Sequence, residues 1–469
     1  MFRKVLTTMV FLSSSLSAEA QTPKVVVVGA GLAGLTTAYR LHQSGVDVHL
    51  YEARNRVGGR VFTANVGGKI AELGGEGITD GGPAENICHL IEEFHLELAH
   101  SEFTLKHALI SEEELIPMNS LLRAKQWDPD QLKDKLSSLA VSAQNLREVI
   151  LGILDEKDPI YRVLAVRIAA YEGATVEKLS PYYTETLYQM LMGGISLVYQ
   201  GDGREDSSII RASIQGGNAL LPEKMAEALG DRVHLGRPLT KIARGDDYCL
   251  TFEDGASVRA DLLVLAIPCP VFKSIVFEEG VLPAERLETI EKVHYGTNAK
   301  VLIPLSAPPS HTMGLVSDRW VSFLDSDCHF LTLYYTGEFG RFSPKTLLHN
   351  CSSDWPLLEV GFGVDLPPVD ALTYARDEAF SSYGSSVGYS WPNDPYAGGS
   401  YSYIAPGQET LLTDTQEVLG EQVRTLFAPV DEKLYFAGEH TSILFDVGGT
   451  MEAACESGER IARMILKKL

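Results

Sequence analysis

The sequence predicts an α/β fold in which a parallel-sheet domain is interleaved with a second domain of mixed sheet and helices. Two runs of residues carry this prediction: a β-branched segment with a glycine-rich turn near the N-terminus, and a strand, turn and helix near the C-terminus. The 469 residues exceed one ordinary domain, and their 45% hydrophobic content allows a large core. We therefore expect two packed units.

The first expected element is a strand over residues 24–28, which read Lys-Val-Val-Val-Val. Consecutive β-branched side chains are typical of a strand that is buried on both faces in a parallel sheet. Residues 29–34, Gly-Ala-Gly-Leu-Ala-Gly, form a turn into a helix that ends at Gly45. Residues 46–51 form a second strand, which ends at Glu52.

The glycines of this turn each have a physical task. Gly29 makes the tight turn, Gly31 lets the backbone approach phosphates, and Gly34 allows the helix to pack closely on the strand. The helix N-terminus offers free N–H groups and the positive end of its dipole to a pyrophosphate. Glu52 lies 21 positions after Gly31, where a carboxylate accepts hydrogen bonds from ribose hydroxyls. The whole arrangement predicts a bound dinucleotide.

The residues after Glu52 indicate which dinucleotide it is. Residues 53–60 read Ala-Arg-Asn-Arg-Val-Gly-Gly-Arg, which resembles the extended FAD signature of the flavin amine oxidase superfamily. In that family the two glycines let the loop run beside the pyrophosphate, and the arginines contact phosphate or brace the loop. Residues 72–75, Glu-Leu-Gly-Gly, are similar to the next family element, where the backbone passes close to the flavin.

Further segments resemble the same superfamily in the same order. Residues 214–218 match the segment that re-enters the cofactor domain, and residues 233–242 match the strand whose backbone meets the adenine near Leu239. Residues 248–260 have the pattern of a hairpin. Residues 262–268 have the pattern of a buried strand. The order of these segments is the evidence, because each is weak alone.

The C-terminal run is the second strong signal. Residues 433–441 are expected to form a strand and a turn, and a helix follows residues 448–450. In the flavin amine oxidases the counterpart of Glu439 binds the ribityl or phosphate region, and backbone N–H groups near Met451 would point at flavin O2. A helix N-terminus there would stabilise the negative charge of the reduced flavin. The resemblance, to monoamine, polyamine and L-amino-acid oxidases, covers nearly all of the chain after its N-terminus.

The best catalytic candidate is Lys300. It matches the family lysine that holds a water beside flavin N5. A buried lysine is costly unless it is solvated or paired, so a lysine within an apolar strand needs a reason. The alternative is a strand-edge lysine whose ammonium reaches solvent.

Residues 398–403 form the other informative stretch. Monoamine oxidases have a cysteine bonded to the flavin at the position of Ser400, so the resemblance implies FAD held without a covalent bond. Tyr401 matches one wall of the aromatic pair that flanks the substrate amine, and Thr450 occupies the place of the other wall. The full aromatic cage is therefore absent. The alternative is that Tyr401 and Trp391 are packing residues.

The resemblance thus assigns catalytic roles to Lys300, Tyr401 and Thr450. It assigns FAD binding to Gly29, Gly31, Leu32, Ala33, Gly34, Glu52, Ala53, Arg54, Gly59, Arg60, Leu73, Gly74, Gly75, Leu239, Trp391, Gly438, Glu439, Thr450 and Met451. We expect no metal site, because none of the 6 cysteines has a metal-binding spacing.

These assignments predict an FAD-dependent amine oxidase. Hydride would pass from the carbon next to the amine nitrogen to flavin N5, water would hydrolyse the imine, and oxygen would reoxidise the flavin and give hydrogen peroxide. The alternatives are another FAD oxidoreductase of the same fold (L-amino-acid oxidase, desaturase or protoporphyrinogen oxidase type) and a flavoprotein without catalysis. An amino-acid oxidase would need an arginine for the substrate carboxylate, for which Arg204 and Arg211 are candidates.

Charge limits the partners. The chain has 62 acidic and 40 basic residues, for a net charge of −22. Such a surface repels phosphate backbones and anionic lipids, so we do not expect nucleic acid or a membrane as a partner. The resemblance implies a small-molecule amine and oxygen instead. The oligomeric state is left open.

The N-terminus resembles a secretory signal peptide over residues 1–20, with basic Arg3 and Lys4, a short apolar stretch and the small-residue pattern of residues 18–20. We therefore expect export, to the periplasm or outside the cell, without a membrane anchor. An exported protein could contain one or two disulfides, but the cysteines are more typical of buried small side chains.

The expected domains alternate along the chain. The FAD-binding domain comprises residues 21–80, 206–290 and 391–469. The substrate domain comprises residues 81–205 and 291–390. Residues 81–205 and 301–390 carry no recognisable motif and should hold the substrate specificity.

Overall fold

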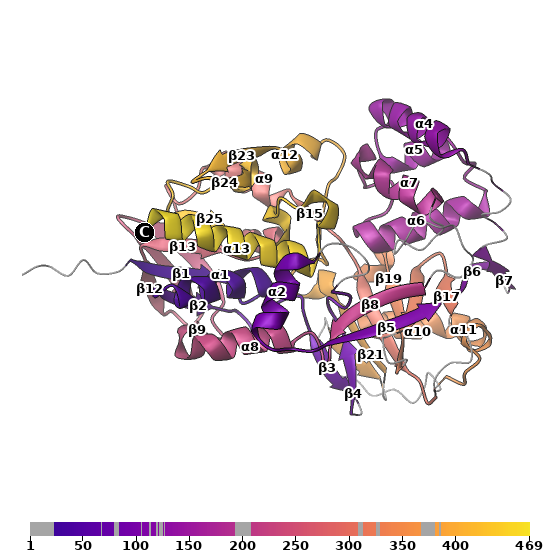
Figure 1. The fold of residues 1–469 in the computed structure, drawn as a ribbon, viewed down its shortest axis with the longest axis horizontal. Helices are drawn as coiled ribbons and strands as arrows, with labels where there is room; N and C mark the ends of the chain where they lie inside the picture. The colour runs from indigo at the N-terminus through magenta and orange to yellow at the C-terminus, as the bar shows by residue number, and fades with distance from the viewer. Residues whose placement is uncertain are drawn as a thin grey trace, which may run out of the picture.

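A computed structural model describes residues 23–66, 68–78, 84–104, 106–111, 114–118, 121, 125, 127–192, 208–307, 313–324, 329–366, 380–383 and 386–469. The expected signal peptide and Arg204 lie outside these residues. The fold is of the expected α/β class, with a parallel sheet and helices on one side of the molecule and a mixed sheet with a helical cluster on the other (Figure 1).

The parallel sheet has five strands in the order β25-β13-β1-β2-β9, and all neighbours are parallel. Its strands are β1 (Lys24–Val28), β2 (Asp47–Tyr51), β9 (Val233–His234), β13 (Leu262–Leu265) and β25 (Leu434–Phe436). The valines of β1 are buried on both faces: Val25 and Val27 belong to one core cluster, and Val26 and Val28 to another. The β-branched run is therefore the centre of a two-sided sheet, as expected.

Two helices from opposite ends of the chain pack together beside this sheet. Helix α1 (Leu32–Gln43) follows the glycine-rich turn, and α13 (Met451–Lys468) is the C-terminal helix, which runs along α1 in Figure 1. They meet closely at Gly458, where an added Cβ would lie 2.5 Å from the carbonyl oxygen of Ala33. Helices α2 (Glu85–Glu93) and α8 (Leu220–Leu229) complete this group.

The mixed sheet has eight strands in the order β20-β21-β16-β19-β18-β17-β6-β7. Its strands are β6 (Lys106–Ser111), β7 (Glu114–Pro117), β16 (Ala299–Pro304), β17 (Met313–Val316), β18 (Trp320–Leu324), β19 (Phe330–Tyr335), β20 (Phe380–Tyr383) and β21 (Ser386–Ser390). In β16, Val301 and Ile303 enter a core on one face, whereas Leu302 packs with Leu73 and Trp391 on the other. Lys300 therefore points to the second face, toward the cofactor domain.

A helical cluster covers one end of the mixed sheet, at the upper right of Figure 1. It comprises α4 (Pro129–Ser142), α5 (Leu146–Leu151), α6 (Pro159–Glu172) and α7 (Thr184–Met192). Asp128 and Asp158 cap the first turns of α4 and α6, and each is followed by a proline at the first helical position. Helix α6 contacts β17 and β18, and its C-terminal end reaches the site described below.

The remaining strands and α-helices lie outside the two large sheets and the helices named above. They are the strands β3 (Thr63–Val66), β4 (Lys69–Glu72), β5 (Leu98–Thr104), β8 (Ser208–Ile214), β10 (Leu239–Arg244), β11 (Tyr248–Phe252), β12 (Ser257–Ala260), β14 (Val276–Phe277), β15 (His294–Tyr295), β22 (Ser402–Tyr403), β23 (Thr415–Val418) and β24 (Glu421–Arg424), and the helices α9 (Ala284–Glu291), α10 (Pro344–Asn350), α11 (Trp355–Phe362) and α12 (Glu409–Thr413).

One expected element is corrected. The sequence suggested a single strand over residues 233–242, but the structure has two: β9 in the parallel sheet and β10 in a separate four-stranded sheet. The chain turns between them at Gly236, which has φ +64°, and Pro238 has no N–H for a sheet ladder. The hairpin and the buried strand after it form as expected.

Two further findings concern cysteines and membranes. Cys88, Cys249, Cys269 and Cys455 are free, and the last two are buried, whereas the side chains of Cys328 and Cys351 lie outside the description. Among the described residues, no helix combines the length and the apolar character needed to cross a bilayer.

Candidate active site

The glycine-rich turn forms an open cradle at the start of α1. An added Cβ at Gly34 would lie 2.0 Å from the carbonyl oxygen of Gly29, and one at Gly29 would lie 2.4 Å from that of Ala266. At Gly31, in contrast, a Cβ would meet no atom within 4 Å, and no side chain caps the helix. The uncapped N–H groups and the free space fit a pyrophosphate at this helix N-terminus.

Glu52 is held in place at the end of β2. Its carboxylate is buried and accepts hydrogen bonds from the backbone N–H groups of Ala30 (2.8 Å) and Arg54 (2.9 Å). Its own N–H donates to His234, and its carbonyl accepts from Arg237. The segment that leads to Leu239 therefore lies directly beside Glu52, so the predicted ribose and adenine contacts are neighbours in space.

The first two arginines of the loop after β2 brace the protein. Arg54 forms an ion pair with the buried Asp394 at 2.5 Å. Burial would raise the pKa of Asp394, but the charge of Arg54 holds this pKa below its usual value. Arg56 donates to the carbonyl groups of Val57 (3.1 Å) and Gly59 (2.9 Å). These contacts brace the loop, and a contact of either arginine with phosphate stays a prediction.

Three distant segments meet at Arg60. Its guanidinium donates to the carboxylate of Glu439 at 2.9 Å and to the carbonyl oxygen of Ser400 at 2.8 Å. Ser402 also donates to Glu439, through its N–H and its hydroxyl. Burial would raise the pKa of Glu439, but the charge of Arg60 lowers it below its ordinary value, so this carboxylate stays ionised.

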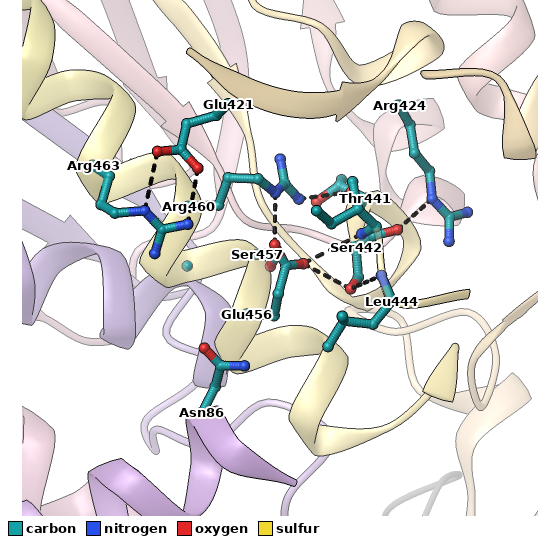
Figure 2. A network of polar contacts seen from close by, with 12 residues as sticks. Asn86, Glu421, Arg424, Thr441, Ser442, Leu444, Glu456, Ser457, Arg460 and Arg463 are labelled. Atoms are coloured by element: carbon teal, nitrogen blue, oxygen red, sulfur yellow. Dashed lines mark hydrogen bonds and ion pairs between the residues drawn. The ribbon is translucent and has the colours of Figure 1, made fainter. Parts of the chain in front are cut away.

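The turn after β25 is anchored to α13 by a buried network (Figure 2). Arg460 forms an ion pair with Glu456 at 2.7 Å and donates to the carbonyl oxygen of Thr441 at 2.8 Å. The hydroxyl of Ser442 donates to Glu456, and Arg424 donates to the carbonyl oxygen of Ser442. These contacts fix the turn that carries Gly438 and Glu439.

Lys300 is buried, with 5% of its surface exposed, so its ammonium does not reach solvent. It donates to the carbonyl oxygens of Glu72 (3.1 Å) and Gly74 (2.8 Å) and to the carboxylate of Glu76 (2.8 Å). An ammonium has three N–H groups, and these acceptors use all of them. A water held by Lys300 would therefore replace one of these acceptors, and the geometry favours a role for its charge.

The segment that Lys300 holds is the one expected beside the flavin. The indole N–H of Trp391 donates to the carbonyl oxygen of Leu73 at 3.2 Å. A Cβ on Gly75 would lie 3.0 Å from the sulfur of Met451, at the start of α13. Predicted site residues from the N-terminal third, the middle and the C-terminus are thus brought together around residues 73–75.

Tyr401 is fixed near the predicted Thr450. Its hydroxyl donates to the carbonyl oxygen of Ala170 (2.7 Å) and accepts from the side chain of Asn298 (2.9 Å). An added Cβ on Gly449 would lie 3.0 Å from the ring of Tyr401. Thr450 is exposed and caps α13, accepting a hydrogen bond from the N–H of Ala453.

Sequence reasoning missed several polar residues of this region: Glu76, Glu172, Asn298 and Tyr334. Asn298 lies just before β16 and Lys300 lies within it, so the two side chains, two positions apart, share a face. Tyr334 is the cross-strand partner of Lys300. Strand periodicity could have suggested Asn298.

Two further charged residues bear on the site. Burial raises the pKa of Glu172 to about 7, and its carboxylate accepts a hydrogen bond from Thr186. The side chain of Arg211 lies outside the description, so its role stays a prediction.

The chain was compared with known proteins once this geometry was established. Residues 32–466 match the profile of the flavin containing amine oxidoreductase family. The chain belongs to this family. It is therefore a flavin-dependent oxidoreductase that acts on amines. Flavin-containing amine oxidase B of Bos taurus is 25% identical over 94% of this chain and 86% of that protein. Pseudooxynicotine dehydrogenase of Pseudomonas sp is 24% identical, over 95% and 86%.

Solved structures agree on the fold. Cyclohexylamine oxidase from Brevibacterium oxydans superposes with a TM-score of 0.71 and 20% identity over 95% of this chain and 99% of that one. Putrescine oxidase bound to putrescine gives a TM-score of 0.66 at 17% identity, with the same coverage.

Proposed function

We propose that this chain is an oxidase of small-molecule amines that binds FAD without a covalent bond. The observation that carries the proposal is the position of Lys300: a buried ammonium tied to the Leu73–Gly75 segment, on the face of the mixed sheet that meets the cofactor domain. A charge buried on this face, beside the segment that is expected next to the flavin, is placed to act on the electrostatics of the cofactor site.

The residues of the site fit FAD in four places. The start of α1 and Gly31 would receive the pyrophosphate, and Glu52 would bind ribose hydroxyls. The Arg60–Glu439 pair would lie along the ribityl and phosphate region. The N-terminus of α13 at Met451 would face flavin O2 and stabilise negative charge there.

FAD would supply the redox chemistry: it accepts a hydride at N5 from the carbon next to the amine nitrogen, and oxygen then takes the electrons as hydrogen peroxide. The protein would position the substrate and exclude water. The ring of Tyr401 would form one wall beside the substrate amine, and the charge of Lys300 would stabilise anionic species close to N5. The imine product would be hydrolysed by water to a carbonyl compound and an amine or ammonia.

Anaerobic mixing with a panel of amines tests this proposal. Primary monoamines, diamines, N-methylated amines and amino acids would be added separately to the flavin-loaded protein, and the flavin absorbance followed. We expect at least one amine class to bleach the flavin, and air to restore the colour with release of one hydrogen peroxide per amine. Bleaching by amino acids alone would favour the amino-acid oxidase alternative. Bleaching by dithionite but by no amine would refute the proposal.

A further inference from the structure

The partner of Lys300 has a position that the sequence did not suggest. Glu76 follows the Glu-Leu-Gly-Gly segment by one residue, and its carboxylate lies 2.8 Å from the ammonium of Lys300, 224 positions away. Both side chains are almost fully buried, with 6% of Lys300 and 10% of Glu76 exposed. The cation at this site is therefore half of an ion pair.

The nearby Glu72 is a weaker partner, although the charge of Lys300 acts on its carboxylate as well. Its carboxylate accepts hydrogen bonds from the hydroxyl of Thr63 and the N–H of Asn218, and only its backbone carbonyl contacts Lys300. Burial raises the pKa of Glu72 to about 7, so a large fraction of it is neutral near pH 7. Glu76 is thus the carboxylate in direct contact with the ammonium of Lys300.

The pair has a physical consequence at any redox group beside it. A lone ammonium in a water-poor site acts over several ångströms, whereas an ammonium beside a carboxylate acts as a dipole whose field decays faster. The carboxylate therefore reduces the stabilisation that Lys300 gives to an anionic reduced flavin or to superoxide. It also removes most of the cost of burying the lysine.

Resting on the proposed function, we propose that Glu76 is a positioning residue that holds Lys300 and attenuates its charge, and so limits the rate at which the reduced enzyme reacts with oxygen. The electrons pass from the reduced flavin to oxygen, which leaves as hydrogen peroxide with two protons. Glu76 exchanges no electron or proton in this step. It acts only through Lys300.

The test uses the flavin-loaded protein reduced with stoichiometric dithionite, so it needs no amine substrate. Stopped-flow mixing with oxygen gives the reoxidation rate constant, and equilibration with a reference dye gives the flavin reduction potential. Glu76→Gln keeps the shape and a carbonyl acceptor for Lys300 but removes the charge. We expect it to speed reoxidation by about tenfold, the effect of roughly 1.4 kcal/mol at the barrier, and to raise the reduction potential.

Three matched variants make the result specific. Glu76→Asp keeps the charge and should restore near wild-type values. Glu421→Gln also removes a carboxylate from an ion pair, with Arg463, but Glu421 lies in β24, away from Lys300, and the change should affect neither measurement. In a Lys300→Met background, Glu76→Gln should have no further effect, because Glu76 acts through the ammonium that this background lacks.

The proposal is overturned if Glu76→Gln binds flavin normally and changes neither the rate constant nor the potential, or if it acts equally with and without Lys300. If Glu76→Gln alone loses flavin or unfolds, the stability of the variant that combines Glu76→Gln with Lys300→Met tests the pairing. Recovery of stability on adding Lys300→Met supports the pairing, and no recovery refutes it. Since dithionite replaces the amine, a failed amine panel would not affect this outcome.

Discussion

At the scale of the residue, the buried charges of the site are held by specific partners. Lys300 pairs with Glu76, Arg60 with Glu439, and Arg54 with Asp394. A buried charge costs several kcal/mol unless such partners are present, so each pair joins segments that must be correctly packed before the charge is tolerated. The two predictions at this scale concern single side chains of the site, Lys300 and Ser400.

The first of these predictions concerns Lys300→Met. The change keeps length and apolar character but removes the charge, and we expect reoxidation by oxygen to slow by roughly 10²-fold while reduction by substrate continues. Stopped-flow measures the two halves separately. Stability should also fall by about 3 kcal/mol, because the buried ion pair between Lys300 and Glu76 is broken. The control Lys69→Met removes a partly buried lysine that donates to Leu305 instead and should leave reoxidation unchanged. A normal reoxidation rate with full flavin content would contradict the role of Lys300.

The second concerns Ser400, which is buried beside Gly296 and has no thiol for a flavin bond. We expect FAD to remain noncovalent. Precipitation of the protein with acid should leave yellow FAD in the supernatant, identified by its mass. Flavin that remains with the pellet would show that another residue forms a bond.

At the scale of the element, α13 links the turn at Glu439 to α1. Its network with Thr441 and Ser442 fixes the turn, and its close approach to α1 fixes the helix that starts at the cradle. Helix packing thus sets the distance between the two helix N-termini that are proposed to face FAD. The position of Gly458 is the sensitive point of this arrangement.

The substitution Gly458→Ala tests whether the close packing of α13 on α1 is needed. Alanine adds up to about 1 kcal/mol of helix propensity, but its Cβ would lie 2.5 Å from a backbone oxygen of α1 and 2.7 Å from Cβ of Thr36. Because backbone cannot move aside cheaply, we expect a net loss of about 1–2 kcal/mol in the free energy of unfolding and weaker FAD binding. Urea unfolding and flavin titration measure these. Gly245→Ala, where a Cβ would meet nothing within 4 Å, is the control. Equal stability of both variants would show that the helices can separate.

At the scale of the whole molecule, acid stability depends on buried groups. His440 is buried behind Glu439, with its Nδ1 3.0 Å from the hydroxyl of Tyr295. Burial and the charges of Arg60 and Arg424, against the opposing charge of Glu439, together lower the pKa of His440 to about 4. The unfolded chain binds this proton near pH 6.5, so the protein loses stability as the pH falls from about 6.5 to about 4.

We therefore expect His440→Gln to remove about 2 kcal/mol of the stability difference between pH 7 and pH 4.5. Glutamine stays neutral at both values and can still meet the hydroxyl of Tyr295. Urea unfolding with saturating FAD at each pH gives the two free energies. A variant with the same pH dependence as the wild type would assign acid sensitivity to other groups.

Export is a further prediction for the whole molecule. The pattern of residues 1–20 predicts cleavage after Ala20, so N-terminal sequencing of protein from its native host should begin at Gln21. Protein that keeps Met1 and stays in the cytoplasm would refute the prediction.

The sequence predicted those parts of the molecule whose pattern is local. The valines of β1, the turn with Gly29 and Gly34, and the acid at Glu52 lie within one short stretch, and the structure has the strand, turn, helix and strand in these places. Backbone geometry and burial at such sites are decided by neighbours along the chain, which is why glycine and β-branched side chains can be interpreted there directly. The α/β class and the family followed from the order of such patterns.

Only the tertiary structure decided which distant groups meet. Nothing near Lys300 in the sequence indicates Glu76, and nothing near Arg60 indicates Ser400 or Glu439, which are 340 and 379 positions away. β6 and β7 likewise join a sheet whose other strands come almost 200 residues later in sequence. Such contacts depend on how two domains built from alternating segments fold onto each other. The sequence by itself thus determined a flavin-binding amine oxidoreductase and its glycine-rich cradle. The charge balance around Lys300 was decided by packing. An ion pair forms where buried surfaces bring opposite charges within reach, whatever the distance between the two residues along the chain.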